Sequence, residues 1–336
     1  MEAGQIAEAA SPGLRERLEE RLRGSPALAA AGVIAVIFVL LVISQGLHDV
    51  MQTGLNGLSL GAIYALGAVG LTLVYGILRL VNFAHGDFLT FGAFMAYLVN
   101  VTWGAPLVVA VFWAMIATAV LGLLFERLLW GPMRRKRAGF LQLIIMSIGL
   151  AFLLRAIYQW FWGTEIRNLD VNRSDVVELL GLRIGQTELI VVVVGVTVLL
   201  AVGLMLRFSL LGKRMRALSD DLELAETAGI DTRRVVLFTW IFAGGLAGLA
   251  GVLAGAITNI YPEMGFELLL PIFAAVILGG IGDAFGALAA GLVLGVMTEW
   301  STLLIDARWK IAVGFVVLVI VLIVRPQGIF GRAKAI

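Results

Sequence analysis

The sequence GKRMRALSDDLELAETAGIDTRR, residues 212–234, is a polar stretch between two long apolar segments. Its Asp, Lys and Arg side chains cannot lie in hydrocarbon, where each costs about 2.5–3.5 kcal/mol on insertion scales. The stretch is therefore a water-exposed loop between two segments that lie in a membrane. This alternation of apolar and charged sequence decides the fold class.

The loop carries a helical pattern of apolar residues. They recur at roughly the spacing of a helix: Met215, Leu218, Leu222, Ala225 and Ile230. Gly229 followed by Asp231 is typical of a helix C-terminus, so we expect one short amphipathic helix that ends there. Such a helix lies on lipid headgroups or inserts its apolar face into a groove on a partner. Because the loop also contains acidic residues, which disfavour an anionic lipid surface, a protein partner is favoured over a solvated loop.

The composition indicates a polytopic membrane protein. Hydrophobic residues make up 60% of the chain and charged residues only 14%, against about 25% charged in soluble domains. The net charge of +2 gives no indication of nucleic-acid binding. Cysteine is absent and the two histidines, His48 and His85, are far apart in the sequence, so we expect no disulfide, no metal site and no cofactor.

Ten apolar segments are candidates for membrane spans, for which about 20 mostly apolar residues are needed. They are residues 27–45, 54–78, 87–101, 105–125, 139–162, 189–207, 235–257, 268–280, 284–303 and 309–324. The segments that begin at 87 and 268 are short, so eight, nine or ten crossings all fit the sequence. The expected fold is an all-α, polytopic transmembrane helical bundle.

The distribution of basic residues predicts the orientation of the chain. If all ten segments cross with both ends in the cytoplasm, nineteen Lys and Arg residues fall inside and five outside, which agrees with the positive-inside rule. Loop 212–234 is then cytoplasmic. The first 26 residues are charged and lack a small-residue cleavage site, so they are not a cleavable signal. Within them, residues 14–23 predict an amphipathic surface helix.

One basic residue, Arg155, lies inside an apolar segment. Its long side chain could extend outward to the membrane interface near Trp162, and we expect this arrangement, with a role in a pore or a subunit contact as the alternative. The following segment, 163–188, is polar enough to fold over the outer face, although a solvated loop is equally compatible with its sequence.

Glycine is concentrated inside the apolar segments, as in GGLAGLAGVLAG (244–255) and GALAAGLVLG (286–295). Small residues let helices approach closely, so we expect tight packing, with helix mobility as the alternative. In LGGIGDAFG (278–286) the glycines and an aspartate interrupt an apolar run and predict a broken or re-entrant helix. Its candidate residues for the translocation path are Gly279, Gly280, Gly282 and Asp283.

A second polar interruption occurs in VNFAHGDFLTFGAF, residues 81–94. Asn82, His85 and Asp87 could cap the start of a helix, which is the simplest interpretation. The alternative is that this segment lines or gates a path, with Asn82, His85, Gly86 and Asp87 as the candidate residues. A catalytic His and Asp pair is disfavoured because no nucleophile accompanies it. The chain also lacks the phosphate-binding loop GxxxxGK[ST], so it has no such site for ATP and is not expected to be an enzyme.

Four stretches resemble one family. They are TGLNGLSLGAIYALGAVGLTLVYGILRLVNFAHGDFLTFGAF (53–94), the loop GKRMRALSDDLELAETAGID, AAVILGGIGDAFGALAAGLVLGVMTE (274–299) and VRPQGIFG (324–331). Together they are similar to the LivH-like permeases, the integral-membrane subunits of ABC importers for branched-chain amino acids. The resemblance covers residues 51–331.

The resemblance implies ATP-driven import with several partners. A binding protein outside the membrane delivers the amino acid, this chain and a second homologous permease form the path in the lipid bilayer, and two ABC ATPase subunits bind on the cytoplasmic side. Glu223, Ala225 and Gly229 resemble the importer coupling motif E-A-A-x-x-x-G, with Leu224 in place of one alanine. The other residues assigned to this ATPase-coupling loop are Arg216, Asp221 and Ile230.

The resemblance also gives a domain division. Residues 1–26 form a cytoplasmic amphipathic segment, 27–50 an additional span and short loop, 51–331 the permease domain and 332–336 a cytoplasmic tail. The expected location is a bacterial or archaeal inner membrane, with both termini cytoplasmic. The expected cargo is a branched-chain or other hydrophobic amino acid. Urea or short amides are the alternative within the family, and an ion-coupled secondary carrier is the alternative from another class.

The orientation can be tested by labelling, because the chain has no native cysteine. A cysteine at Ser219 should react with an impermeant maleimide only from the cytoplasmic side, and a cysteine at Asn172 only from outside, because the basic loops stay inside. Labelling is measured in intact cells and in inverted vesicles. The opposite labelling pattern would contradict the orientation.

Overall fold

The computed structural model describes residues 26–179, 181–324 and 328, and all ten apolar segments are helical in it. They are α2 (Pro26–Gln45), α3 (Leu47–Leu78), α4 (His85–Tyr97), α5 (Leu107–Phe125), α7 (Phe140–Trp162), α8 (Gln186–Phe208), α11 (Thr232–Ile257), α12 (Met264–Gly279), α13 (Ala284–Trp300) and α14 (Lys310–Val324). Six helical stretches are long and apolar enough to cross a membrane, whereas α2 and α12 provide shorter apolar helices. The prediction of a polytopic helical bundle is confirmed.

The remaining elements are short and lie at the two ends of the bundle. They are the π-helical segments η1 (Leu98–Thr102) and η2 (Glu126–Trp130), α6 (Gly131–Arg135), β1 (Val176–Leu179), β2 (Leu182–Gly185), α9 (Leu210–Asp220), α10 (Leu222–Thr227) and the 3₁₀ turns η3 (Ser301–Leu303) and η4 (Ala307–Trp309). The strands form an antiparallel hairpin, so the expected polar segment between α7 and α8 has regular structure. The expected surface helix at 14–23 lies outside the described residues.

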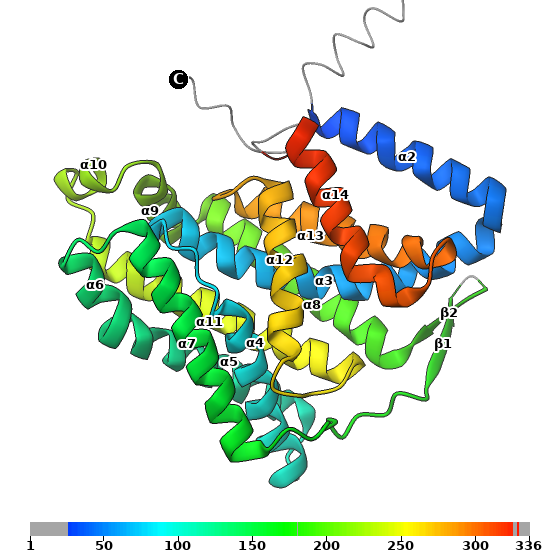
Figure 1. Ribbon diagram of the computed structural model, residues 1–336, viewed down its shortest axis with the longest axis horizontal. Helices are drawn as coiled ribbons and strands as arrows, with labels where there is room; N and C mark the ends of the chain where they lie inside the picture. Colours follow the sequence, from blue (N-terminus) through cyan, green and yellow to red (C-terminus); the bar gives the residue numbers. More distant parts are fainter. Residues whose placement is uncertain (1–25, 180, 325–327, 329–336) are drawn as a thin grey trace, which may run out of the picture.

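The two ends of the bundle, at the left and right of Figure 1, are identified by the elements that α3 contacts there. Near its start, the Gln52 side chain donates to the carbonyl of Arg183 at 2.5 Å and accepts from the Arg183 amide at 2.8 Å, which ties α3 to the hairpin. At its other end Arg79 donates to the carbonyl of Ser219 in α9 at 2.9 Å. Figure 1 accordingly places α6, α9 and α10 at the left and the hairpin at the right.

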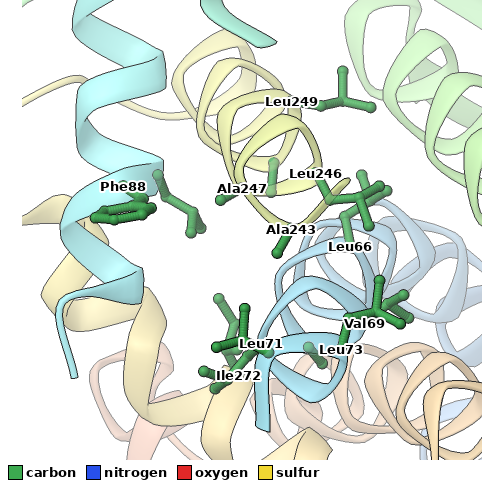
Figure 2. Close-up of a cluster of buried hydrophobic side chains, with 14 of the residues drawn as sticks. Leu66, Val69, Leu71, Leu73, Phe88, Ala243, Leu246, Ala247, Leu249 and Ile272 are labelled. Carbon is green, nitrogen blue, oxygen red and sulfur yellow. The ribbon is translucent and has the colours of Figure 1, made fainter. Parts of the chain in front are cut away.

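Helices α3 and α11 form the interior of the bundle. In the most apolar 18-residue stretch of each helix, 89% of α3 and 72% of α11 is buried. The buried share is only 22% for the helical stretch that contains α5 and for α7. Figure 2 shows where the inner helices meet. Leu66, Val69, Leu71 and Leu73 of α3 contribute to the same cluster as Ala243, Leu246, Ala247 and Leu249 of α11, with Phe88 of α4 and Ile272 of α12. The outer helices present their apolar side chains to the surroundings, as expected for a protein in lipid.

Glycine brings α3 and α13 into close contact. A Cβ at Gly295 would overlap the Cα of Gly61, and a Cβ at Gly291 would lie 2.5 Å from the Cα of Ala65. Lipid tails are as apolar as leucine, so helix association in a membrane depends on such close packing. The predicted packing role of the glycine-rich segment 286–295 is thus confirmed.

The additional N-terminal helix α2 packs at the side of the bundle. Its Phe38 ring lies 5.7 Å from the ring of Trp300, whose indole nitrogen donates to the carbonyl of Val50 at 3.0 Å. The rest of α2 exposes large side chains such as Ile43, which is 78% exposed. Figure 1 shows α2 standing off from the other helices, so α2 contributes little to the core.

The helix contact between α3 and α13 can be tested with matched glycine variants. Gly295→Ala should lower the apparent Tm and the yield of folded protein, because the new methyl group has no room against the α3 backbone; overpacking typically costs about 1–3 kcal/mol. The control is Gly149→Ala, since nothing lies within 4 Å of a Cβ at Gly149. Equal thermal stability of both variants in detergent would contradict the close-packing account.

Candidate functional site

Loop 212–234 folds as two helices, so the expectation of a single amphipathic helix is wrong. The break falls at Asp221, whose backbone is extended with φ −152° and ψ 113°. Its side chain accepts a hydrogen bond from the amide of Leu224 at 3.0 Å and so caps the start of α10. An aspartate in this role satisfies an otherwise free amide and stabilises a new helix start, which the apolar spacing alone does not reveal.

The apolar residues of the loop divide between the interior and the surface. Met215, Leu218 and Ala225 are buried against the bundle, whereas Leu222 and Leu224 are 41% and 66% exposed. The predicted apolar stripe therefore anchors α9 and α10 to the rest of the chain. The two leucines of α10 are left as an exposed apolar pair beside the acidic Glu223, which is also exposed.

The end of α10 follows the prediction made for Gly229. Its φ is +81°, a left-handed conformation that favours glycine, and its amide donates to the carbonyl of Glu226 at 3.0 Å. The amide of Ile230, which is half-buried, donates to the carbonyl of Ala225 at 3.1 Å. Asp231 then caps α11 by accepting from the amide of Arg234. This tight turn fixes the direction in which α10 leaves the bundle.

A cleft of about 680 Å³ lies beside α9 and α10, at the end of the bundle where α3 ends. It is lined by the end of α3, by η2 and α6, and by the start of α11, and its charged residues are Arg79, Arg127, Arg134, Arg135, Arg233, Glu126, Asp220 and Glu226. Glu126 organises one wall, because it forms an ion pair with Arg134 and accepts from the indole of Trp240 at 2.7 Å. Arg216 lies outside this cleft and donates to the carbonyl of Arg207 at 3.3 Å.

The glycine-rich break between α12 and α13 lies next to this cytoplasmic loop. Gly280 and Gly282 have φ of +98° and +93°, and Asp283 caps α13 by accepting from the amides of Phe285 and Gly286. A Cβ at Gly76, in the last turn of α3, would lie 3.2 Å from the Ser219 hydroxyl and 3.6 Å from the Cα of Gly282.

The α12–α13 break is thus a turn at the same end of the bundle as α9. A Cβ at Gly279 would overlap the carbonyl carbon of Gly286, so the two helices are closely packed where they diverge. The sequence predicts the break itself, but not its depth in the membrane. Its position beside Ser219 places the break near α9, at the end of the bundle where α3 ends, rather than at mid-depth.

The second polar interruption, residues 82–87, lies deep inside the bundle. The imidazole Nε2 of His85 lies 3.0 Å from the carbonyl oxygen of Gly67. Gly67 is about 16 Å from the cytoplasmic end of α3 at 1.5 Å per residue. The chain therefore leaves α3 at Arg79, turns back into the membrane and starts α4 at depth. Within this return the side-chain oxygen of Asn82 accepts from the amide of Ala84 at 3.1 Å.

Asp87 does not cap α4 as expected, because no side chain caps the start of this helix. Instead its Oδ1 accepts a hydrogen bond from Arg155 Nε of α7 at 3.1 Å, in an ion pair where Asp87 is fully buried. The Tyr158 hydroxyl donates to the backbone carbonyl of Asp87 at 2.9 Å. Gly86 allows the close approach of α12, since a Cβ there would overlap the carbonyl oxygen of Gly265.

The expected outward path of Arg155 is therefore wrong. Its side chain follows the direction that helical geometry favours, toward the N-terminal end of α7, and meets Asp87 deeper in the membrane. A buried carboxylate is a better partner than the distant interface, since breaking such a pair costs about 3–5 kcal/mol. Arg155 and Tyr158 were missing from the expected path residues. The available signal was a cation and an acid that each lie within an apolar segment.

These features define a class of protein. The chain has many apolar helices, an irregular backbone and an ion pair inside the membrane, and a folded cytoplasmic projection, which together are typical of a membrane transport protein. Residues 53–322 match the family model described as branched-chain amino acid transport system / permease component. The chain belongs to this permease family.

Several curated proteins are similar to the chain. It is 32% identical over 298 residues to the high-affinity branched-chain amino acid transport system permease protein LivH of Escherichia coli K12, with 84% of this chain and 96% of LivH covered. It is 30% identical over 309 residues to the corresponding protein BraD of Pseudomonas aeruginosa, with 86% and 98% covered. It is 25% identical over 338 residues to LivM of E. coli K12, with 91% and 75% covered.

Proposed function

We propose that this chain is the membrane permease subunit of an ATP-driven importer for branched-chain or other hydrophobic amino acids. The family match and the identity to LivH and BraD over most of both chains support the class and the cargo. The observation that carries the coupling to ATP is α10, which projects from the cytoplasmic end with Leu222 and Leu224 exposed. The chain is placed in a bacterial or archaeal inner membrane with both termini in the cytoplasm, and residues 51–331 form its permease domain.

The proposal includes three kinds of partner. LivH and LivM of E. coli are both named as permease proteins of a high-affinity branched-chain amino acid transport system, and both are similar to this chain. We therefore infer that a second homologous permease packs beside it. Two ABC ATPase subunits bind the cytoplasmic end, and a substrate-binding protein binds the outer end.

The ATPase contact is assigned to α10 and the adjoining cleft. Exposed leucines on a short helix are suited to insertion into an apolar groove of a partner, while surrounding charges fix the orientation. Asp221 sets the start of α10 and Gly229 its end, so the projecting helix has a defined direction. The arginines of the cleft would contact acidic residues of the same ATPase.

The path itself is assigned to the polar residues inside the bundle. Irregular backbone at membrane depth is tolerated where protein or a water-filled path covers it, and residues 79–84 meet this description. Asn82, His85, Gly86 and Asp87 lie at this position. The turn formed by residues 279–283 would move with the coupling loop, because Gly282 and Ser219 both face Gly76.

The function is tested by reconstitution. The chain, its second permease and the ATPases are purified together and placed in proteoliposomes with the binding protein and radiolabelled leucine. Uptake should require ATP on the side of the membrane where the ATPases lie. It should stop when the ATPase is inactivated. Leucine uptake that persists without ATPase and follows an ion gradient would instead identify a secondary carrier. Uptake of urea or short amides without uptake of leucine would change the cargo.

The coupling role can be tested at Gly229. Gly229→Val should leave assembly intact and reduce ATP-driven uptake at least about tenfold, because a β-branched residue at φ +81° costs roughly 1–2 kcal/mol and redirects α10. No atom lies within 4 Å of a Cβ at Gly229, so backbone conformation is the only local cause. The matched control is Gly229→Asn, because asparagine tolerates the left-handed conformation and should retain most uptake. Normal uptake by the valine variant would remove this role.

A further inference from the structure

A continuous strip of side chains connects α7 with α12 on one face of the bundle. At its outer end Gln159 donates to the Glu263 carboxylate at 2.8 Å. One turn deeper, the Arg155 guanidinium carbon lies 4.5 Å from the Phe266 ring. At this level a cation and an aromatic ring bridge α7 and α12. The contact between α3 and α13 is made by small residues instead.

The deepest level of the strip includes irregular backbone. The amide of Phe83, in the return between α3 and α4, donates to the Ser147 hydroxyl of α7 at 3.2 Å. The Phe83 ring lies 5.1 Å from the ring of Phe273 in α12. Both rings are half-exposed on the surface of the chain. The strip therefore runs from polar groups at the outer end, past Arg155, to aromatic rings beside the return.

The side chain of Arg155 is partly exposed on this face. Its Nε is held by Asp87, while its side chain is 14% exposed and no hydrogen bond to its two terminal nitrogens is found among the described residues. Phe152 and Phe266 border it, with ring centres at 5.4 and 4.5 Å from the guanidinium carbon, and are 64% and 42% exposed. A guanidinium that faced lipid tails here would cost several kcal/mol, so this face must meet something polar.

We propose that Arg155 binds the carboxylate of the transported amino acid as it passes between this face and the second permease subunit. The proposal rests on the proposed function and names a substrate contact within it. A guanidinium presents paired N–H donors that match the two oxygens of a carboxylate, and Arg155 has two terminal nitrogens free for this. The apolar side chain of the substrate would lie against Phe152 and Phe266, whose exposed rings flank the cation.

Asp87 acts in this site as a positioning residue. Its Oδ1 fixes the inner edge of the guanidinium through Nε, which turns the opposite edge toward the face. Its second oxygen, Oδ2, is buried without a hydrogen-bond partner among the described residues, so the carboxylate keeps capacity to accept one more hydrogen bond.

The test separates carboxylate binding from a purely structural ion pair. The double variant Asp87→Asn, Arg155→Met removes both charges together, so no buried charge is left unpaired and assembly should survive. In the reconstituted complex its maximal leucine uptake should fall about ten- to a hundredfold, the range expected for loss of hydrogen bonds to a charged group. The concentration of leucine-loaded binding protein that gives half-maximal uptake should stay unchanged, since docking of that protein is untouched.

A second variant tests the proposal if the double variant fails to assemble. Arg155→Lys keeps the cation and its pairing with Asp87 but loses the paired donors, so its maximal uptake should also fall at least about tenfold while complex yield stays normal. The matched control is Glu178→Gln with Arg183→Gln, which neutralises an ion pair exposed in the hairpin, with side chains 65% and 75% exposed, and should transport normally.

Three results would overturn the proposal. Wild-type uptake by the double variant or by Arg155→Lys would show that the guanidinium is not needed by the substrate. A loss of complex yield in both variants would show that the pair serves packing. If the complex with the wild-type chain takes up no leucine when ATP is supplied, the proposed function itself is contradicted. Failure of the Arg155 proposal and failure of the proposed function are therefore distinguishable.

Discussion

The structure depends on one constraint, which is that hydrocarbon offers neither water for polar groups nor a hydrophobic force between helices. Helices must therefore approach closely enough for dispersion forces to hold them, and every buried charge needs a partner within the chain or beside it. Glycine meets the first need where α13 crosses α3 at Gly61 and Gly295. The ion pair between Asp87 and Arg155 meets the second. Both follow from the same absence of water.

The same constraint explains why the irregular return between α3 and α4 has hydrogen-bond partners within the chain. The return after Arg79 breaks helical hydrogen bonding at depth, and local partners replace it: the Asn82 side chain accepts from the amide of Ala84, and the Ser147 hydroxyl accepts from the amide of Phe83. His85 lies against the carbonyl of Gly67 in the same region. Such a segment is costly to build, so its presence beside an ion pair points to transport rather than to packing alone.

The sequence predicts local features well and long-range ones poorly. The ten apolar segments, the left-handed turn at Gly229 and the cap at Asp283 were predictable because each depends on neighbours within a few residues. The division of the cytoplasmic loop at Asp221 was missed because apolar spacing continues across it. The partner of Arg155 could not be predicted, since Asp87 is distant in sequence and only the packing of α4 against α7 brings the two together. The depth of the two interruptions was hidden for the same reason.

Helix α12 connects the two parts of the candidate site. The turn after its C-terminus, at Gly280 and Gly282, lies beside Gly76 and thus near Ser219 of α9. Its N-terminal end lies against Gly86, and its Phe266 ring covers Arg155. A helix carries a displacement from one end to the other, whereas the left-handed glycines at its end allow α12 to tilt and the interior Pro271 allows it to bend. A shift of α9 that reached Gly282 would therefore change the position of Phe266 over Arg155, because one short helix carries both contacts.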